Sequence, residues 1–304
     1  MTTRYIISSL LMVSMIFTAS ASIKSIPFKL VRGVMVIHAT VDGQTGNFIL
    51  DSGVPGVVLN ARYFTGKKSY AINCSGFQFI GGISEECQGR VIRMSLGEVS
   101  YRGYAAVVDL QPVEKAKRMN ILGMVGFKAF KKYEVVFDFH LEEIQLYELD
   151  QKGNRTSPEH YVLPDATLNL RFLEHLPYIS ARIGSREIRL GLDTGAEVNI
   201  LSEEIYEDNG KLVDNIRSKR IVTMGGTLET LICGNVRSLR INGQLLPEMQ
   251  TIFMSLDQLN KLSGPDLDGL IGPEFLKHFR TAFNFKRKEI YFWKGDDRLR
   301  AARN

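Results

Sequence analysis

Two acidic tripeptides are the residues of this chain whose types and spacing could do chemistry. Asp51-Ser52-Gly53 follows the apolar run Phe48–Leu50, and Asp193-Thr194-Gly195 follows Leu190–Leu192. Two carboxyl groups about 3 Å apart cannot both ionise, so such a pair keeps one proton and offers an acid and a base together. One Asp-[Ser/Thr]-Gly string means little, since it arises by chance in roughly one chain in ten of this size and is typical of a turn. The second copy points to acid–base hydrolysis.

The flanking sequence repeats along with the tripeptides. Aligning Asp51 with Asp193 (193 − 51 = 142) places Val41 on Ile183, Leu50 on Leu192 and Leu59 on Leu201. Later segments correspond as well: Met124–Phe127 with Leu270–Pro273, Phe137–Phe139 with Phe283–Phe285, and Gly81-Gly82 with Gly225-Gly226. A repeat of this length predicts a duplicated domain, because solenoid units run about 20 to 50 residues.

Strands are the elements that must position the acidic residues. A hairpin signal at Asp42-Gly43 separates two apolar runs, and the second run leads into Asp51. A strand that is apolar on both faces belongs in a core. We expect strands at Val34–Val41, Asn47–Leu50, Arg90–Leu96, Tyr104–Leu110, Tyr133–Phe139, Glu143–Leu149, Tyr178–Ile183, Glu187–Leu192, Arg220–Met224, Val236–Ile241, Met249–Phe253, Phe279–Phe285 and Glu289–Trp293. Short helices are expected at Gly126–Lys131, Glu203–Asp208, Leu256–Leu262 and Pro273–Phe279.

Domain boundaries follow from the repeat and from composition. Residues 1–21 are expected to be a secretory signal peptide, with Arg4 before an apolar stretch and Ala19-Ser20-Ala21 as the cleavage site. A membrane anchor is the alternative, but the apolar stretch is short and interrupted by serine. We then expect an N-terminal lobe at 22–150, a polar linker at 151–160 and a C-terminal lobe at 161–304. The mature chain is expected to be exported to the periplasm or the extracellular space, without stable membrane insertion.

Both halves resemble the retropepsin and pepsin superfamily of aspartic proteases. The resemblance is carried by Ile49–Gly53, Gly191–Ala196 and Asp268–Gly272, and Ile80–Ile83 is similar to retropepsin flap tips. It implies an all-β fold of two similar β-barrel lobes, related by a pseudo-two-fold, with the active-site cleft between them. One chain provides both carboxylates, so we expect a monomer rather than lobes paired between two chains.

The resemblance also implies a division of roles among the repeated residues. Asp51 and Asp193 would be the catalytic pair of an aspartic endopeptidase, activating water against a peptide or protein substrate, with no metal or organic cofactor. The hydroxyls of Ser52 and Thr194 would cross-brace the two loops. The remaining assignments are Gly53, Gly195, Gly126 and Gly272 as active-site support, and Ile80, Gly81, Gly82, Ile83, Gly225 and Gly226 as flap or substrate-binding residues.

Two departures from the family pattern leave an alternative open. No Tyr occurs between Ile80 and Gly89, where pepsins carry one, and Val54 stands where most members have Ala, Thr or Ser. Val54 cannot donate a side-chain hydrogen bond, which disfavours the charged carboxylate, so we expect activity nearer neutral pH than in pepsins. The alternative is a catalytically inactive, protease-like module that binds peptides or regulates.

The remaining composition adds few constraints. The formal net charge of +5 is mixed in sign along the chain, so we expect no nucleic-acid partner. Three cysteines suit neither a disulfide scaffold nor a zinc site, although Cys74 and Cys87 could pair across a hairpin. The five histidines are scattered without metal-binding spacing, so each is expected to be structural or exposed. Four repeat-matched aromatics are expected in the core: Phe127, Phe137, Phe275 and Phe283.

Overall fold

The structure is a computed structural model that describes residues 23–64, 70–73, 86–157, 161–222, 228–261 and 266–294. Both proposed flap tips lie outside these residues: Ile80, Gly81, Gly82 and Ile83 in the first half, and Gly225 and Gly226 in the second. Cys74 also lies outside them, and Cys233 is a buried free thiol.

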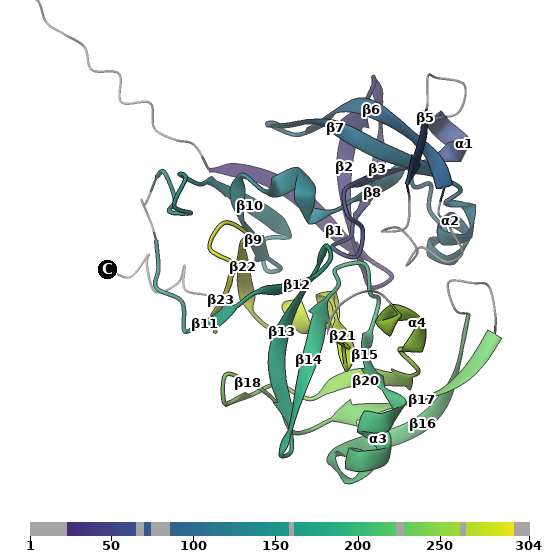
Figure 1. Cartoon of the computed structure of the whole chain (residues 1–304), viewed down its shortest axis with the longest axis vertical. Helices are drawn as coiled ribbons and strands as arrows, with labels where there is room; N and C mark the ends of the chain where they lie inside the picture. The colour runs from purple at the N-terminus through teal and green to yellow at the C-terminus, as the bar shows by residue number, and fades with distance from the viewer. Residues whose placement is uncertain are drawn as a thin grey trace, which may run out of the picture.

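The described chain is mostly β and forms two sheets (Figure 1). The first sheet runs β11 (Ala166–Asn169), β23 (Glu289–Trp293), β22 (Arg280–Asn284), β9 (Tyr133–Asp138), β10 (Glu143–Glu148), β1 (Lys24–Val31), β2 (Val34–Val41), β3 (Gln44–Leu50), β8 (Gly123–Val125), β4 (Val57–Asn60), β7 (Val99–Val108), β6 (Glu86–Leu96) and β5 (Tyr70–Asn73). The second runs β16 (Val213–Val222), β17 (Leu228–Val236), β20 (Met249–Met254), β15 (Asn199–Ser202), β21 (Gly269–Ile271), β14 (Arg186–Leu192), β13 (Leu176–Ile183), β18 (Leu239–Ile241) and β19 (Gln244–Leu245), with β12 (Arg171–Leu173) against β13.

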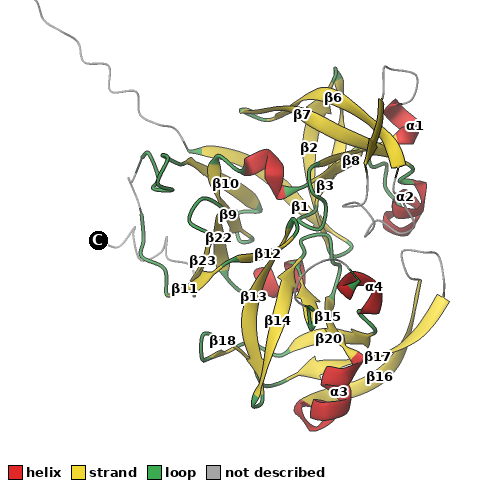
Figure 2. Ribbon diagram, in the orientation of Figure 1, coloured by secondary structure: helices red, strands yellow, loops and turns green. Residues whose placement is uncertain are grey.

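The helices are short (Figure 2). They are α1 (Ala61–Phe64), α2 (Gln111–Lys117), the 3-10 turns η2 (Phe127–Phe130) and η3 (Gly210–Leu212), α3 (Glu203–Asn209), α4 (Asp257–Asn260) and α5 (Pro273–Leu276). The expected strands that lead into the two acidic tripeptides are confirmed. Strands β1, β4 and β15 and helix α2 were not expected; β4 and β15 have only four residues each, too few to show a periodic pattern.

The first half closes into a barrel of six strands. Strands β2, β3, β8, β4, β7 and β6 follow one another, and β6 returns to β2 through the pairs Thr40–Ser95 and Val41–Met94. The side chains inside are apolar and buried, including Ile37, Phe48 and Leu59. Closure leaves no free strand edge within this ring, so the barrel is a stable support for the strand ending at Asp51.

The second half does not close, which corrects the expectation of two barrels. Its strands follow the same order, but the expected strand Val236–Ile241 is broken: β17 ends at Val236 and β18 begins at Leu239. The backbone N–H of Arg237 donates instead to Leu212 O at 3.0 Å. This bond extends the antiparallel β16–β17 pairing by one residue beyond Val213 and Val236, and the second sheet is a curled half-barrel.

A run of six strands joins the two halves. Strands β22 and β23, yellow in Figure 1, lie beside β9 and β10 of the first half. In the β9–β22 pair, Val136 lies opposite Ala282, its own counterpart in the repeat (282 − 136 = 146), and Phe137 lies opposite Thr281 while Val135 lies opposite Phe283. Each half therefore offers the same edge to the other.

Aromatic rings fill the core beneath this join. The Phe127 ring lies 5.0 Å from that of Phe283 and 5.9 Å from that of Phe137, and Phe137 and Phe283 meet edge to face at 5.6 Å. With Phe275, these four side chains are at most 6 % exposed, which confirms their expected place in the core. Aromatic pairs of this geometry add about 0.5–1.5 kcal/mol each beyond their burial.

The segment expected to be the linker is bound to the join over its described part. Arg155 pairs with the buried carboxylate of Glu134, and its guanidinium stacks 3.6 Å from the Tyr147 ring centroid. Asn284 Nδ2 donates to Gly153 O at 2.9 Å and to Glu134 Oε2 at 3.1 Å. Within the described ranges, no helix has the length and apolar character needed to cross a bilayer.

Candidate active site

Matching strands carry the two acidic residues to one place. Strand β3 runs parallel to β8, and β14 runs parallel to β21, so each acidic residue leaves its strand beside a parallel neighbour. The backbone N–H of Asp51 donates to Val125 O and that of Asp193 to Ile271 O, both at 2.9 Å. The last strand residues before them are buried, so each tripeptide starts from a fixed position.

The two tripeptides are joined by four hydrogen bonds that pass between the halves. Ser52 Oγ donates to Leu192 O at 2.7 Å and accepts from the Thr194 N–H at 2.8 Å. Thr194 Oγ1 donates to Leu50 O and accepts from the Ser52 N–H, both at 2.9 Å. Ser52 and Thr194 are 1 % and 0 % exposed. Each hydroxyl thus satisfies one buried donor and one buried acceptor of the opposite loop, which is the cross-brace that the family resemblance implied.

Glycine is required after each hydroxyl because the loops meet there. A Cβ built on Gly195 would lie 2.5 Å from the Asp51 Cγ, and one on Gly53 would lie 3.0 Å from the Asp51 Oδ1 and 3.1 Å from the Asp193 Oδ1. Contacts under 3.0 Å essentially do not occur for real Cβ atoms. Any other residue at 195 would push the opposite carboxyl group out of place.

Gly126 and Gly272 lie directly beneath the two loops. A Cβ on Gly126 would lie 2.1 Å from Val54 O, and one on Gly272 would lie 2.5 Å from Ala196 O and 2.6 Å from Asp193 O. These obstacles are backbone atoms, which cannot move aside as a flexible side chain can. The apolar-apolar-Gly segments therefore support the loops by letting the backbone approach closely.

The two carboxyl groups come together at the centre of the brace, where the same built Cβ on Gly53 would touch an oxygen of each. Burial and the neighbouring Asp193 carboxylate raise the pKa of Asp51 well above its usual range, against the hydrogen bond from the Gly53 N–H at 2.8 Å. Burial also raises the pKa of Asp193, but the backbone N–H groups of Gly195, at 2.9 Å, and of Gly53 favour its charged form, as do the neighbouring Asp51 and His175. The pair is therefore arranged to hold one proton, on Asp51.

Val54 is a core residue rather than a failed donor to the carboxylates. It is 2 % exposed and packs in an apolar cluster with Val34, Ile49, Val58 and Met124. Its backbone N–H closes the loop by donating to Asp51 O at 3.2 Å, as the Ala196 N–H does to Asp193 O at 3.1 Å. Burial, rather than the loss of a side-chain donor, is thus the main cause of the raised pKa of Asp51.

His175 belongs to this site and was not expected there. It lies in the β12–β13 turn of the second half, and its Nε2 is 2.7 Å from Gly53 O in the first half. The two residues are 122 positions apart, and no local pattern around a single histidine indicates such a contact. No signal in the sequence could have distinguished it from the other histidines.

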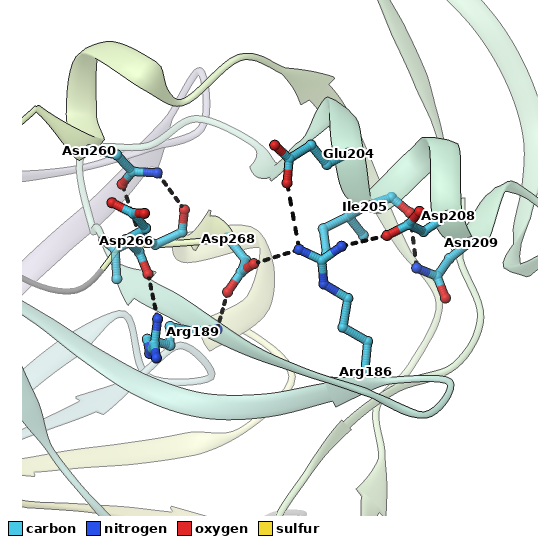
Figure 3. A network of polar contacts seen from close by, with 10 residues as sticks. Arg186, Arg189, Glu204, Ile205, Asp208, Asn209, Asn260, Asp266 and Asp268 are labelled. Atoms are coloured by element: carbon cyan, nitrogen blue, oxygen red, sulfur yellow. Dashed lines mark hydrogen bonds and ion pairs between the residues drawn. The ribbon is translucent and has the colours of Figure 1, made fainter.

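An arginine-centred network anchors the strand that ends at Asp193 (Figure 3). The guanidinium of Arg186, at the start of β14, lies 2.6 Å from Asp208 Oδ2, 3.3 Å from Asp268 Oδ1 and 3.6 Å from Glu204 Oε2. Asp268 Oδ2 accepts the Arg189 N–H at 2.8 Å. Asp268 precedes β21, so the network ties β14 to the parallel strand beside it.

Polar side chains also support the first half, where the buried Glu114 accepts from the Tyr63 hydroxyl at 2.7 Å and from the Ile121 N–H at 2.9 Å. There, Leu122 N–H donates to Asn47 O at 2.8 Å and Asn47 Nδ2 donates to Asn120 O at 3.0 Å. Each strand that leads to an acidic residue is paired on both sides, β3 with β2 and β8, and β14 with β13 and β21. The described residues contain no group of three or more His, Cys, Asp or Glu side chains placed to hold a metal ion.

Comparison with known proteins identifies the second half. Residues 179–275 match the family model described as aspartyl protease, a range that contains Asp193, Gly195 and Gly272. A search of curated protein sequences finds no match for the chain. Residues 179–275 therefore form an aspartyl protease domain of the retropepsin-like kind.

Proposed function

We propose that this protein is an aspartic endopeptidase in which Asp51 and Asp193 are the catalytic pair. The single observation that carries the proposal is the reciprocal brace of Ser52 and Thr194, which brings the two carboxyl groups together. An aspartyl protease family match over the second half supports it. The first half supplies the matching acidic loop.

The geometry suggests how the reaction proceeds. Asp193, favoured in its charged form by two backbone N–H groups, takes a proton from a water molecule bound between the carboxyl groups. The oxygen of that water attacks the peptide carbonyl carbon while Asp51 donates its proton to the carbonyl oxygen. The tetrahedral intermediate then collapses: the C–N bond breaks, and the leaving amine nitrogen takes the proton held by Asp193. The proton of a hydroxyl on the same carbon returns to Asp51.

We also propose that the halves are two lobes of one protease related by a local two-fold, with the peptide substrate bound between them. The reciprocal brace and the pairing of Val136 with its counterpart Ala282 support this arrangement. In this arrangement one chain supplies both carboxyl groups, so the active species is a monomer. Light-scattering mass measured on the active fraction tests this, and activity confined to a dimer would contradict it.

The experiment for the proposed function is digestion of unfolded casein or a peptide library between pH 3 and 8, with and without pepstatin. Asp51→Asn and Asp193→Asn should each remove cleavage, because neither variant can form the one-proton carboxyl pair. Asp214→Asn is the matched control: it changes an aspartate of the same half that is 42 % exposed and outside both the brace and the Arg186 network. Binding of peptides without cleavage at every pH would favour the non-catalytic module instead.

Export remains a proposal that rests on the first 21 residues. Expression of the full chain followed by mass measurement of the exported protein should find a mature chain that begins at Ser22. Retention of the intact N-terminus in the membrane fraction would contradict cleavage and favour an anchor.

A further inference from the structure

His175 occupies a turn of the second half that reaches the acidic loop of the first. Leu173 and Leu176, on either side of the turn, are buried and paired, so the hairpin holds the ring in place. The ring itself is partly buried, with Nε2 2.7 Å from Gly53 O. Gly53 also donates its N–H to Asp51 Oδ1 at 2.8 Å. Gly53 is therefore held at its N–H by the Asp51 carboxyl group and at its carbonyl oxygen by His175.

The repeat makes this contact one-sided. The residue that corresponds to His175 in the first half is Gly33 (175 − 142 = 33), which also lies against the opposite acidic loop. A Cβ built on Gly33 would lie 2.8 Å from Glu197 O. Gly33 fills this position by close backbone approach and offers no side-chain donor, so a titratable group at this position occurs in the second half alone.

The hydrogen bond and the charge of His175 respond differently to pH. A carbonyl oxygen can only accept, so Nε2 must carry a hydrogen whether the ring is neutral or positively charged. The contact with Gly53 therefore persists through titration. Protonation at Nδ1 adds a positive charge close to Asp193 without removing the hydrogen bond.

We propose that His175 is a positioning residue of the carboxyl pair: its Nε2–H holds the Gly53 loop, and its charge in acid keeps the pair singly ionised. This inference rests on the proposed peptidase function. The charged groups that act on the ring are Asp193, in the acidic loop of the same half, and Glu174, on its own hairpin. Both favour the imidazolium, as does the Gly53 carbonyl.

Burial decides the range in which the charge appears. It lowers the pKa of His175 by more than the Gly53 carbonyl, Glu174 and Asp193 raise it, so the ring is neutral near pH 7 and gains its charge in acid. The same charge lowers the pKa of Asp193. As pH falls, the imidazolium delays protonation of the second carboxyl group, which would otherwise inactivate the pair. The acid limit of activity therefore lies at lower pH with His175 than without it.

The test compares pH profiles of kcat/KM for wild type, His175→Gln, His175→Leu and the control His38→Gln, whose side chain is exposed on β2. Glutamine keeps an N–H donor but cannot take a charge, so its acid limb should move to higher pH by about half to one unit. Leucine removes the donor as well, and should lower kcat about tenfold or more at every pH because the loop loses its support. The glutamine variant should recover most of that kcat. Identical profiles for glutamine and wild type, or equal kcat losses for glutamine and leucine, would overturn the proposal.

A second readout separates this inference from the proposed function. NMR titration of the His175 ring in wild type and Asp193→Asn measures the coupling without any cleavage, and the pKa of His175 should fall in the variant because the facing negative charge is lost. If the pKa of His175 falls in Asp193→Asn but the wild-type protein cuts no peptide, the peptidase function is refuted and the histidine–carboxylate coupling stands. If the pKa of His175 is the same in both proteins but the wild-type protein has pepstatin-sensitive activity, the coupling is refuted and the peptidase function stands.

Discussion

Removing one hydroxyl of the cross-brace tests whether the two halves are held together where the structure indicates. Thr194→Val keeps the shape of the side chain and replaces Oγ1 with a methyl group. Two buried groups then lose their partner: the Ser52 N–H, now 2.9 Å from that oxygen, and the Leu50 carbonyl, also at 2.9 Å. Both lie where water has little access, since Ser52 is 1 % and Leu50 0 % exposed.

The expected loss of stability follows from those two groups. A buried donor or acceptor left without a partner costs about 1–3 kcal/mol, so we expect the free energy of unfolding to fall by about 2–5 kcal/mol. Most domains have about 5–15 kcal/mol in total, so the variant should still fold. Its carboxyl pair should be displaced, and a misplacement of about 1 Å can cost about 100-fold in kcat.

Urea unfolding and casein cleavage measure the two effects, with two controls. Thr194→Ser keeps the hydroxyl and should retain most of the stability and activity. Thr281→Val makes the same chemical change at a fully buried threonine whose Oγ1 has no hydrogen-bond partner in the described structure, and should be neutral or stabilising.

The brace also predicts coupling between its two hydroxyls. Ser52→Ala should cost about as much as Thr194→Val, and the double variant should cost less than the sum because loops that have separated lose both sets of bonds together. A Thr194→Val variant within about 0.5 kcal/mol of wild type, or no less stable than Thr281→Val, would refute the brace as the source of stability.

Three further predictions concern the groups around the brace. Gly126→Ala and Gly272→Ala should each destabilise the fold by several kcal/mol, since the new Cβ would meet backbone oxygens at 2.1 Å and 2.5 Å. Gly56→Ala is the control, because the space at its Cβ is open. Equal thermal midpoints for all three variants would contradict the close approach. Arg155→Met should cost about 3–5 kcal/mol by leaving the Glu134 carboxylate buried without its partner, and calorimetry showing a change below about 1 kcal/mol would refute a structural role for the linker. Asp51→Asn should raise the thermal midpoint at pH 7 and change it little near pH 3. A carboxyl group whose pKa is raised in the folded state stabilises the fold below its unfolded pKa and loses that stabilisation as pH rises through the folded pKa. An equal effect of the variant at both pH values would contradict the raised pKa.

Much of the site could be predicted from the chain alone. The duplicated Asp-[Ser/Thr]-Gly strings, the apolar strands before them and the glycines beneath them are local patterns, and local patterns report strand formation and tight turns directly. Part of the aromatic core was predictable for the same reason, because Phe137 and Phe283 occupy matched positions of the repeat. The flap tips stay predictions, since Gly81-Gly82 and Gly225-Gly226 lie outside the described residues.

The features that escaped prediction depend on contacts between residues far apart in the chain. The break between β17 and β18 interrupts the expected strand Val236–Ile241, and no local pattern in that run marks it. His175 joins the site because a hairpin of one half reaches the loop of the other.

The amino-acid sequence by itself determined that two similar halves each bring an aspartate to the end of a buried strand, because apolar periodicity and turn chemistry act over a few residues. Only the tertiary structure decided that the halves share one brace, that one barrel closes while the other stays open, and that a histidine faces the carboxyl pair. These outcomes depend on which buried donors and acceptors meet across the join, and that choice is made by packing over more than a hundred residues of chain.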